Sequence, residues 1–166
     1  MSAEEIRQLL LDRFGEEIIL NLDSESVPPT LEVAAPAIAE VCRELHENEQ
    51  TYFDYLACLS GIDNGPEAGI MEVVYHLYSI PYNLQFALKV SLVRPTEEEE
   101  TVALPSVSPI WRTADWHERE AYDMLGIRFT GHPDLRRILL PADWKGFPLR
   151  KDYQEEEYYH GIKIIY

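Results

Sequence analysis

The apolar and polar positions of the first half of the chain follow two periods, one helical and one strand-like. Apolar residues fall on a helical period between Ser2, a good capping residue, and Gly15, which predicts a first helix. A second, amphipathic helix is predicted from Pro36 to near Asn48, with its apolar face against a sheet. Short apolar runs predict two strands, at 16–22 and 30–35.

Three further apolar runs complete the predicted sheet. Residues 52–62 are almost continuously apolar, as expected of a central strand buried on both faces. Residues 70–80 and 84–93 predict two strands joined by a hairpin, because only 81–83 separate them. The order α-β-β-α-β-β-β predicts an α+β fold, a two-layer mixed sheet with its helices on one face.

Residues 116–153 combine charged residues of both signs with large aromatic residues. The first part is predicted to be a helix that Asp115 caps and Gly126 ends. On this helix Arg119 and Asp123 are four positions apart and are expected to face each other. A solvated helix with surface ion pairs would show the same pattern, so the charges alone do not establish a site.

The residues after this helix have no helical or alternating period. From Pro141 to Tyr153 the segment is rich in Trp, Phe, Tyr and Arg, the residues that are enriched where proteins contact each other. We therefore expect an extended C-terminal arm that lies along a partner. The chain is predicted to be one structural domain, with a core at 1–115 and a docking part at 116–166.

The composition excludes several classes of function. The formal net charge is −16, and residues 1–100 carry 20 acidic and 5 basic side chains, which disfavours binding to nucleic acid or directly to anionic lipid. No apolar run approaches the ~20 residues that span a bilayer, and the start of the chain lacks a basic and apolar leader. Cys42 and Cys58 alone cannot hold an iron–sulfur cluster, which takes about four such ligands.

Catalytic motifs of the common enzyme classes are absent from the sequence, and His117-Glu118 lacks the second histidine of a zinc protease. Four acid–base groups could be assembled into a hydrolase site: Glu118, Glu120, Asp123 and His132. Four basic side chains could bind an anion such as phosphate: Arg136, Arg137, Arg150 and Lys151. Without a glycine-rich cradle, we favour carboxylates of a neighbouring protein as their partners.

The order of charged residues in this segment resembles the signature of the 30 kDa subunit family of respiratory complex I. That complex is the proton-pumping NADH:quinone oxidoreductase. The residues that carry the resemblance are Glu118-Arg119-Glu120, Asp123, Met124-Leu125, the run from Gly131 to Leu139 and the run from Pro148 to Tyr153.

The resemblance implies a docking subunit of the respiratory chain that carries no redox centre and has no activity alone. It would pack against the hydrogenase-like subunit and the cluster-bearing subunit of the same complex, close to the site of quinone reduction. NADH, flavin, iron–sulfur clusters and quinone would belong to the assembled complex, and this chain would hold no cofactor. The chain would then be peripheral at the cytoplasmic side of the cell membrane, and bound there only through the complex.

No catalytic, cofactor-binding or metal-binding residue is expected in this chain. For Trp144 and Phe147 we favour contact with the partner over packing on the chain itself, and a chain without its partner could form homodimers through the open surface. The residues expected to bind the partner are Glu118, Arg119, Glu120, Asp123, His132, Arg136, Arg137, Trp144, Phe147, Arg150, Lys151, Asp152 and Tyr153.

Two alternatives stay open at this point. The first is the equivalent subunit of a membrane-bound hydrogenase, of a coenzyme F420-dependent dehydrogenase or of a ferredoxin-driven complex, since the signature concerns docking and not the electron donor. The second, from a different class, is an independent soluble binding module or enzyme.

Overall fold

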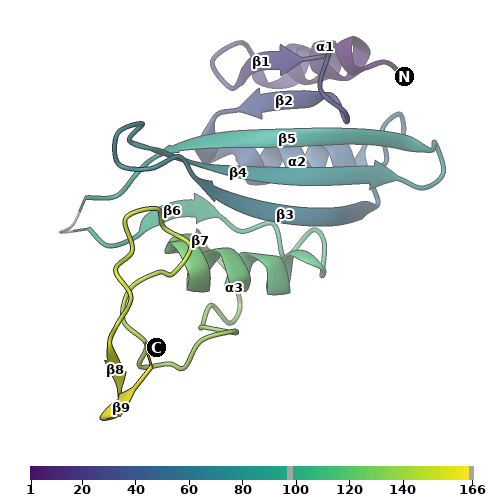
Figure 1. Cartoon of the computed structure of the whole chain (residues 1–166). Helices are drawn as coiled ribbons and strands as arrows, with labels where there is room; N and C mark the ends of the chain where they lie inside the picture. Colours follow the sequence, from purple (N-terminus) through teal and green to yellow (C-terminus); the bar gives the residue numbers. More distant parts are fainter. Residues whose placement is uncertain (97–98, 165–166) are drawn as a thin grey trace.

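Five strands pair into a mixed sheet at the centre of the computed structural model, which describes residues 1–96 and 99–164 (Figure 1). The predicted α+β class and the order of the first seven elements are confirmed, apart from a short 3-10 helix. The elements are α1 (Ala3–Phe14), β1 (Ile19–Asp23), β2 (Thr30–Val33), η1 (Ala35–Ala37), α2 (Ile38–Glu47), β3 (Tyr55–Asp63), β4 (Ile70–Ser79), β5 (Leu84–Val93), β6 (Val102–Pro105), α3 (Ala114–Leu125), β7 (Ile127–Thr130), β8 (Tyr158–Tyr159) and β9 (Ile162–Lys163).

The order of the strands in the main sheet is β1-β2-β5-β4-β3. Only β2 and β5 run parallel, and the predicted β4–β5 hairpin is confirmed. The prediction that 52–62 is a central strand buried on both faces is wrong. β3 begins at Tyr55, after a turn in which Tyr52 has a positive φ, and it is an edge strand.

The core lies on the face of the sheet that the helices cover. The buried side chains of β4 alternate with half-exposed ones, as expected of a strand with one covered face. Figure 1 shows α2 behind the sheet and α3 along the edge formed by β3. One hydrophobic cluster joins the three helices to the sheet and includes Ile6 and Leu10 of α1, Val41 and Leu45 of α2, and Ala121 and Leu125 of α3.

The helix ends follow the predictions in part. Ser2 caps α1, as predicted, and forms reciprocal bonds with Glu5, and Gly126 ends α3 in the left-handed conformation. The prediction that Asp115 caps α3 is wrong, because the helix already begins at Ala114 and has no side-chain cap. The preceding Thr113 instead donates its hydroxyl to the Leu56 carbonyl, 3.1 Å away.

α3 covers polar backbone groups of the edge strand β3. The Leu59 N–H donates to His117 Nδ1 at 3.3 Å, near the Thr113 bond to Leu56. The indole N–H of Trp111 donates to the Phe53 carbonyl at 3.0 Å, just before the strand. Because an uncovered edge strand is a template for pairing with other chains, these bonds protect this side of the sheet.

The four-residue strands β6 and β7 were not predicted from the sequence. They run parallel to each other and flank α3 in the chain, so that β6, α3 and β7 form a small strand–helix–strand unit. Ile127 and Phe129 are buried while their neighbours are exposed, which places one face of β7 in the core. This unit fixes both ends of α3.

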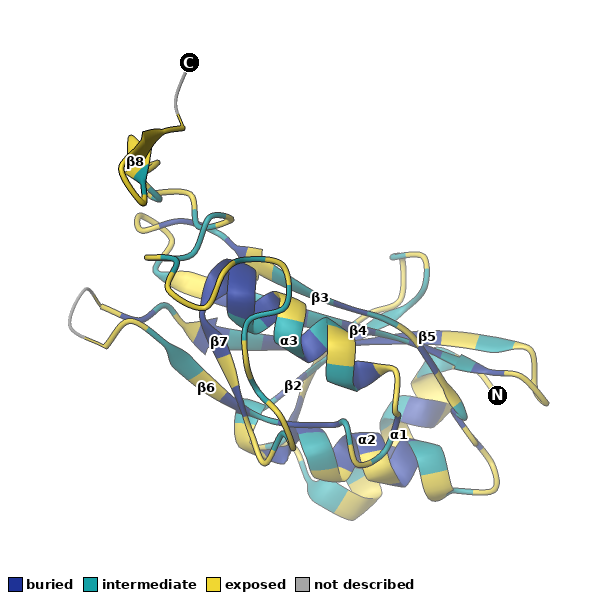
Figure 2. Ribbon diagram, turned by 90° about the horizontal axis from the view of Figure 1, so that it is seen from below, coloured by how far each residue is buried: buried dark blue, intermediate teal, exposed yellow. Residues whose placement is uncertain are grey.

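Between Thr130 and Tyr158 the chain has no helix or strand, and a short hairpin of β8 and β9 follows. In Figure 2 this hairpin is largely exposed, whereas one side of α3 and much of β7 are buried. The division of the domain at residue 115 stays a prediction. Parts of the charge-rich run at 94–101 and of the apolar end of the chain lie outside the described residues.

Gly61 allows α3 to approach β3 closely, and this contact can be tested. A Cβ atom at Gly61 would lie 2.6 Å from Leu125 Cδ1 and 3.1 Å from Ile127 Cδ1. We expect Gly61→Val to lower the free energy of unfolding by about 1–3 kcal/mol, measured in urea, because the added atoms overpack this contact. Ala57→Val is the control, since Ala57 is exposed on the same strand. Equal stability of the two variants would contradict the close approach.

Candidate functional site

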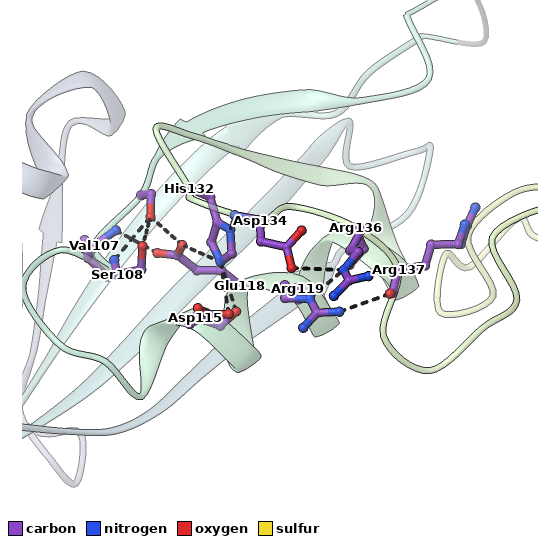
Figure 3. Close-up of polar contacts among 10 residues, drawn as sticks. Val107, Ser108, Asp115, Glu118, Arg119, His132, Asp134, Arg136 and Arg137 are labelled. Carbon is purple, nitrogen blue, oxygen red and sulfur yellow. Dashed lines mark hydrogen bonds and ion pairs between the residues drawn. The ribbon is translucent and has the colours of Figure 1, made fainter.

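The predicted site residues gather around α3 and the segment that follows β7, and Figure 3 shows one part of this region. The structure brings most of them together, but it uses many of them inside the chain. Their side chains therefore divide into a buried polar framework and an exposed outer surface.

Glu118 is a fully buried carboxylate on the inner side of α3. Its Oε2 accepts a hydrogen bond from the Ser106 hydroxyl at 2.6 Å, and its Oε1 accepts one from the Val107 N–H at 2.7 Å. Burial raises the pKa of Glu118 to about 7, although these two bonds act in the opposite direction. The carboxyl group thus joins α3 to the loop after β6.

His132 fastens the turn after β7 to the first turn of α3, and its side chain has no exposed surface (Figure 3). Its Nδ1 accepts from the Asp134 N–H at 3.0 Å, so the ring hydrogen lies on Nε2. Nε2 is 3.1 Å from the Asp115 carbonyl oxygen, to which it donates. It is also 3.9 Å from Glu118 Oε2. Both ring nitrogens are therefore occupied within the chain.

Asp123 is the second fully buried carboxylate of α3. Its Oδ2 accepts from three consecutive backbone N–H groups, those of Ile138 at 3.0 Å, Leu139 at 2.7 Å and Leu140 at 2.9 Å. Its Oδ1 accepts from Arg137 Nη1 at 2.7 Å. Burial alone would raise the pKa of Asp123, but the Leu140 N–H, Arg137 and the other N–H donors hold it below its usual value.

The predicted pairing of Arg119 with Asp123 is wrong. Asp123 pairs with Arg137 instead, whereas Arg119 donates to the carbonyls of Arg136 at 3.2 Å and of Arg137 at 3.3 Å. The pairing within the helix would have placed the positive residue before the negative one, which is the weaker order. The segment after β7 offers each side chain more hydrogen-bond partners than the other could.

The last four carbonyls of α3 all accept hydrogen bonds, three of them from the irregular segment. The Tyr122 carbonyl accepts from the Gly126 N–H. The Asp123 carbonyl accepts from Arg137 Nη1 at 3.0 Å, the Met124 carbonyl from the Leu149 N–H at 3.0 Å, and the Leu125 carbonyl from Arg150 Nε at 2.8 Å. Two guanidinium groups thus lie at the negative end of the helix, where cations are stabilised.

The aromatic residues of the segment are packed on the chain itself. The Phe147 ring lies 4.5 Å from Arg150 Cζ and 5.3 Å from Arg137 Cζ, measured from its centroid. The Trp144 indole N–H donates to the Tyr153 hydroxyl at 3.1 Å. A Cβ at position 126 would come within 2.7 Å of Phe147, which explains the glycine there. Contact of Trp144 and Phe147 with a partner stays a prediction.

The end of the segment is attached to the sheet through Asp63. Its carboxylate accepts from the Lys151 N–H at 2.9 Å and from Arg94 Nε at 2.9 Å. Arg94 also pairs with Asp152. The predicted residues Lys151 and Asp152 thus lie close to the start of the loop after β5, and both are exposed.

These contacts weaken the two alternatives drawn from the same residues. Glu118, Asp123 and His132 have no exposed side-chain surface, so a substrate does not reach them in this structure. Arg137 and Arg150 are bonded within the chain and are not arranged to receive an anion. Among the described residues, no group of three or more His, Cys, Asp or Glu side chains could hold a metal ion. No helix within residues 1–96 and 99–164 is long and apolar enough to cross a membrane.

The outer surface of this region includes apolar residues that are not among the predicted partner-binding residues. Trp116, Leu139 and Leu149 are 66%, 62% and 61% exposed, respectively. Two predicted residues, Glu120 and Arg136, are exposed around the same helix. The exposure of Trp116 can be predicted from the sequence, since Trp116 stands four positions before Glu120 and therefore shares its helix face. The exposure of Leu139 and Leu149 depends on the path of the irregular backbone, which no local sequence pattern predicts.

Comparisons with known proteins give a consistent result. Residues 31–159 match the model of the family described as "Respiratory-chain NADH dehydrogenase, 30 Kd subunit". A protein of Chloroherpeton thalassium, which is named as a subunit of NADH-quinone oxidoreductase, is 44% identical over 161 residues, which are 96% of this chain and 64% of that protein. A protein of the same name from Chlorobium phaeobacteroides is 43% identical over 157 residues, which are 93% of this chain and 90% of that protein.

One solved structure shows the same fold. The match comes from the "membrane-bound sulfane sulfur reductase (MBS), an archaeal respiratory membrane complex", with a TM-score of 0.73 and 23% sequence identity. The matched region covers 91% of this chain and 85% of that chain. The chain thus spans slightly less than two thirds of the Chloroherpeton protein and most of the other two.

The Asp123 contacts predict a loss of stability on substitution. We expect Asp123→Asn to lower the free energy of unfolding in urea at pH 7 by about 2–4 kcal/mol, because an amide cannot replace a charged acceptor of three N–H groups. Since the folded pKa is lowered, this contribution is present above the unfolded pKa, near 3.8, and is lost as the pH falls through the folded pKa. Asp134→Asn, at an exposed ion pair, is the control, and equal effects of the two changes would contradict this role.

Glu118 predicts the opposite pH dependence. Because its folded pKa is raised to about 7, the folded state holds this proton more tightly than the unfolded state does. Its contribution to stability is therefore full below the unfolded pKa and falls as the pH rises to 7. Glu118→Gln should gain stability relative to the unmodified protein by about 2–3 kcal/mol between pH 5 and pH 8, measured by urea unfolding. Glu120→Gln, an exposed control, should show no such trend, and a flat difference for Glu118→Gln would exclude a buried proton.

Proposed function

The chain belongs to the respiratory-chain NADH dehydrogenase 30 kDa subunit family, and from this premise we propose that it is a docking subunit of a proton-translocating NADH:quinone oxidoreductase. In this proposal it carries no redox centre. It packs beside the quinone-reducing subunits and supports electron transfer from NADH through iron–sulfur centres to quinone. The isolated chain has no turnover.

The outer surface around α3 is the observation that carries the proposal. Three large apolar side chains, Trp116, Leu139 and Leu149, are more than half exposed on elements that the buried framework holds in place. Isolated apolar side chains are common on protein surfaces, but exposed apolar residues rimmed by charges are typical of a contact with another protein. Exposed Glu120 and Arg136 supply that rim.

The buried members of the predicted set then have a positioning role. Glu118, Asp123 and His132 do not reach the outer surface, so their effect on a partner passes through the backbone they hold. Fixing a loop before it binds reduces the entropy lost on association. In this proposal residues 1–115 form the supporting core and 116–166 the docking part. The exposed residues make the direct contacts.

We propose the hydrogenase-like subunit and the cluster-bearing subunit of the same complex as the partners. The flavin, the iron–sulfur clusters and the quinone site then belong to other chains of the assembly. The chain reaches the cytoplasmic side of the membrane only through these partners. Without them its uncovered apolar surface would favour homodimers.

The alternative complexes share the fold but are less well supported. The structure of similar fold belongs to a sulfane sulfur reductase, so the fold does not determine the electron donor or acceptor. The relatives with 43–44% identity are instead named as subunits of NADH-quinone oxidoreductase. We therefore favour NADH as the donor of the complex that contains this chain.

Affinity purification of the tagged chain from gently solubilised native membranes tests this function. We expect a large eluate that absorbs visible light as flavin and iron–sulfur clusters do and that reduces quinone with NADH. Clusters without flavin would instead support the hydrogenase or ferredoxin-driven alternatives. A small, colourless eluate would contradict the docking function.

A matched pair of variants tests the surface itself. Leu139→Glu should remove the chain from the large eluate, because it places a charge in the proposed contact while the Leu139 N–H bond to Asp123 can still form. Val93→Glu is the control, since Val93 is 79% exposed at the end of β5. Equal recovery of both variants in the complex would exclude the surface around Leu139.

A further inference from the structure

A groove of about 300 Å³ lies where the edge strand β3 meets α3. β3 contributes Cys58 and Ser60, the helix contributes His117, Glu120 and Met124, and Leu149 of the irregular segment closes one side. The groove is open to solvent and is separate from the buried contacts of Glu118 and Asp123. Neither a strand nor a helix of the described chain fills it.

The groove has polar and apolar surface and a single acidic group. Leu149 offers most of the apolar surface, because Met124 is largely buried. The ring of His117 accepts from the Leu59 N–H through Nδ1, which leaves its hydrogen on Nε2. Glu120 is exposed and has no ion pair or side-chain hydrogen bond among the described residues. The groove therefore offers an apolar wall and an unpaired carboxylate.

The charge of the chain indicates what can occupy this groove. Residues 1–100 carry 20 acidic and 5 basic side chains, and the net charge of the whole chain is −16. A second copy of the chain would bring the same negative charge to Glu120, so a basic partner fits this groove better than a second copy does. A positively charged group is attracted both by Glu120 and by the overall field.

The size of the groove indicates a side chain and not a cofactor. Sites for small molecules have volumes of about 300–1,000 Å³ and bury most of their ligand, whereas this groove is at the lower limit and open. Protein contacts are commonly anchored by one or two large residues, often aromatic or Arg, that enter such a depression. The dimensions therefore fit an anchor residue of another protein.

We propose that this groove receives an apolar segment of a partner subunit that carries a Lys or Arg, whose cation pairs with Glu120. The inference rests on the proposed function and defines one contact within it. The apolar part of the segment lies against Met124 and Leu149, and the pairing excludes water from the carboxylate. Glu120 is then a specificity determinant that selects a basic partner.

Cys58 provides a direct measurement of whether the groove is occupied. It is half-buried and lines the groove, whereas Cys42 is fully buried and burial raises the pKa of its thiol. In the isolated chain a small maleimide should react at Cys58 and spare Cys42. In the purified complex we expect the rate at Cys58 to fall at least about tenfold, because a docked segment covers the thiol.

The outcomes separate this inference from the proposed function. A chain that is present in a complex with flavin and clusters, but reacts at Cys58 as fast as the isolated chain, overturns the groove and leaves the docking function intact. A chain that enters no complex overturns both. The intact complex supplies the segment itself, so the measurement requires no prior identification of the partner residue.

A charge reversal gives a second readout that does not depend on the thiol. Glu120→Lys should reduce recovery of the chain in the complex about tenfold or more, because it places two cations face to face, and Glu120→Gln should reduce it less. Glu40→Lys on the exposed side of α2 is the matched control for the change in net charge. Recovery of Glu120→Lys equal to that of Glu40→Lys would overturn the cation pairing.

Leu149→Ala tests the apolar half of the contact. Leu149 is largely exposed in the isolated chain, and its N–H bond to the Met124 carbonyl does not involve the side chain. The variant should therefore unfold in urea like the unmodified protein and yet be recovered less in the complex. Unchanged recovery, with Cys58 still protected, would show that the apolar wall does not bind the segment.

Discussion

The C-terminal end of α3 is the constraint on which the rest of this region depends. A helix leaves its last four carbonyls without partners within the helix, and here the chain is irregular directly beyond the short strand β7. The irregular segment satisfies three of these carbonyls with Arg137, Leu149 and Arg150. The buried Asp123 carboxylate of the same helix accepts hydrogen bonds from the backbone of that segment. Each of the two elements thus supplies the hydrogen bonds that the other lacks.

This reciprocal arrangement explains how a segment without secondary structure presents a defined surface. A loop of this length is uncommon in a compact domain unless it has a function or is disordered. Three attachments order it here: Asp123 near its start, His132 at the turn before it, and Asp63 at its end. Leu139, whose N–H is bonded to Asp123, is thereby held with its side chain exposed. The buried polar contacts of the region thus hold its exposed apolar side chains in place.

The sequence predicts the fold better than the site, and the reason is the range of the contacts involved. Periodic patterns are local, so α1, α2 and the β4–β5 hairpin follow from them. The apolar run of β3 suggests the centre of the sheet, because a strand covered at its edge by a helix is as apolar as a central one. The strands β6 and β7 have only four residues each, too few for a clear period.

Composition and resemblance indicate the region in which charged and aromatic residues gather, but not the contacts that these residues make. In the sequence, Glu118 and Asp123 have the spacing of charges on an exposed helix face. Nothing in the helix indicates that Glu118 binds Ser106, twelve positions before it, or that Asp123 binds Leu140, seventeen positions after it. Buried carboxylates follow from tertiary contacts and not from local pattern. The exposure of Leu149 has the same origin, because it depends on where an irregular backbone is attached.

The covering of β3 by α3 also bears on how the chain is made. The five strands of the main sheet end at Val93, but the residues that bond to the β3 edge, Thr113 and His117, are translated later. During synthesis the sheet can therefore form while this edge is still open to pairing with other nascent chains. The interval ends when α3 leaves the ribosome and folds onto the strand.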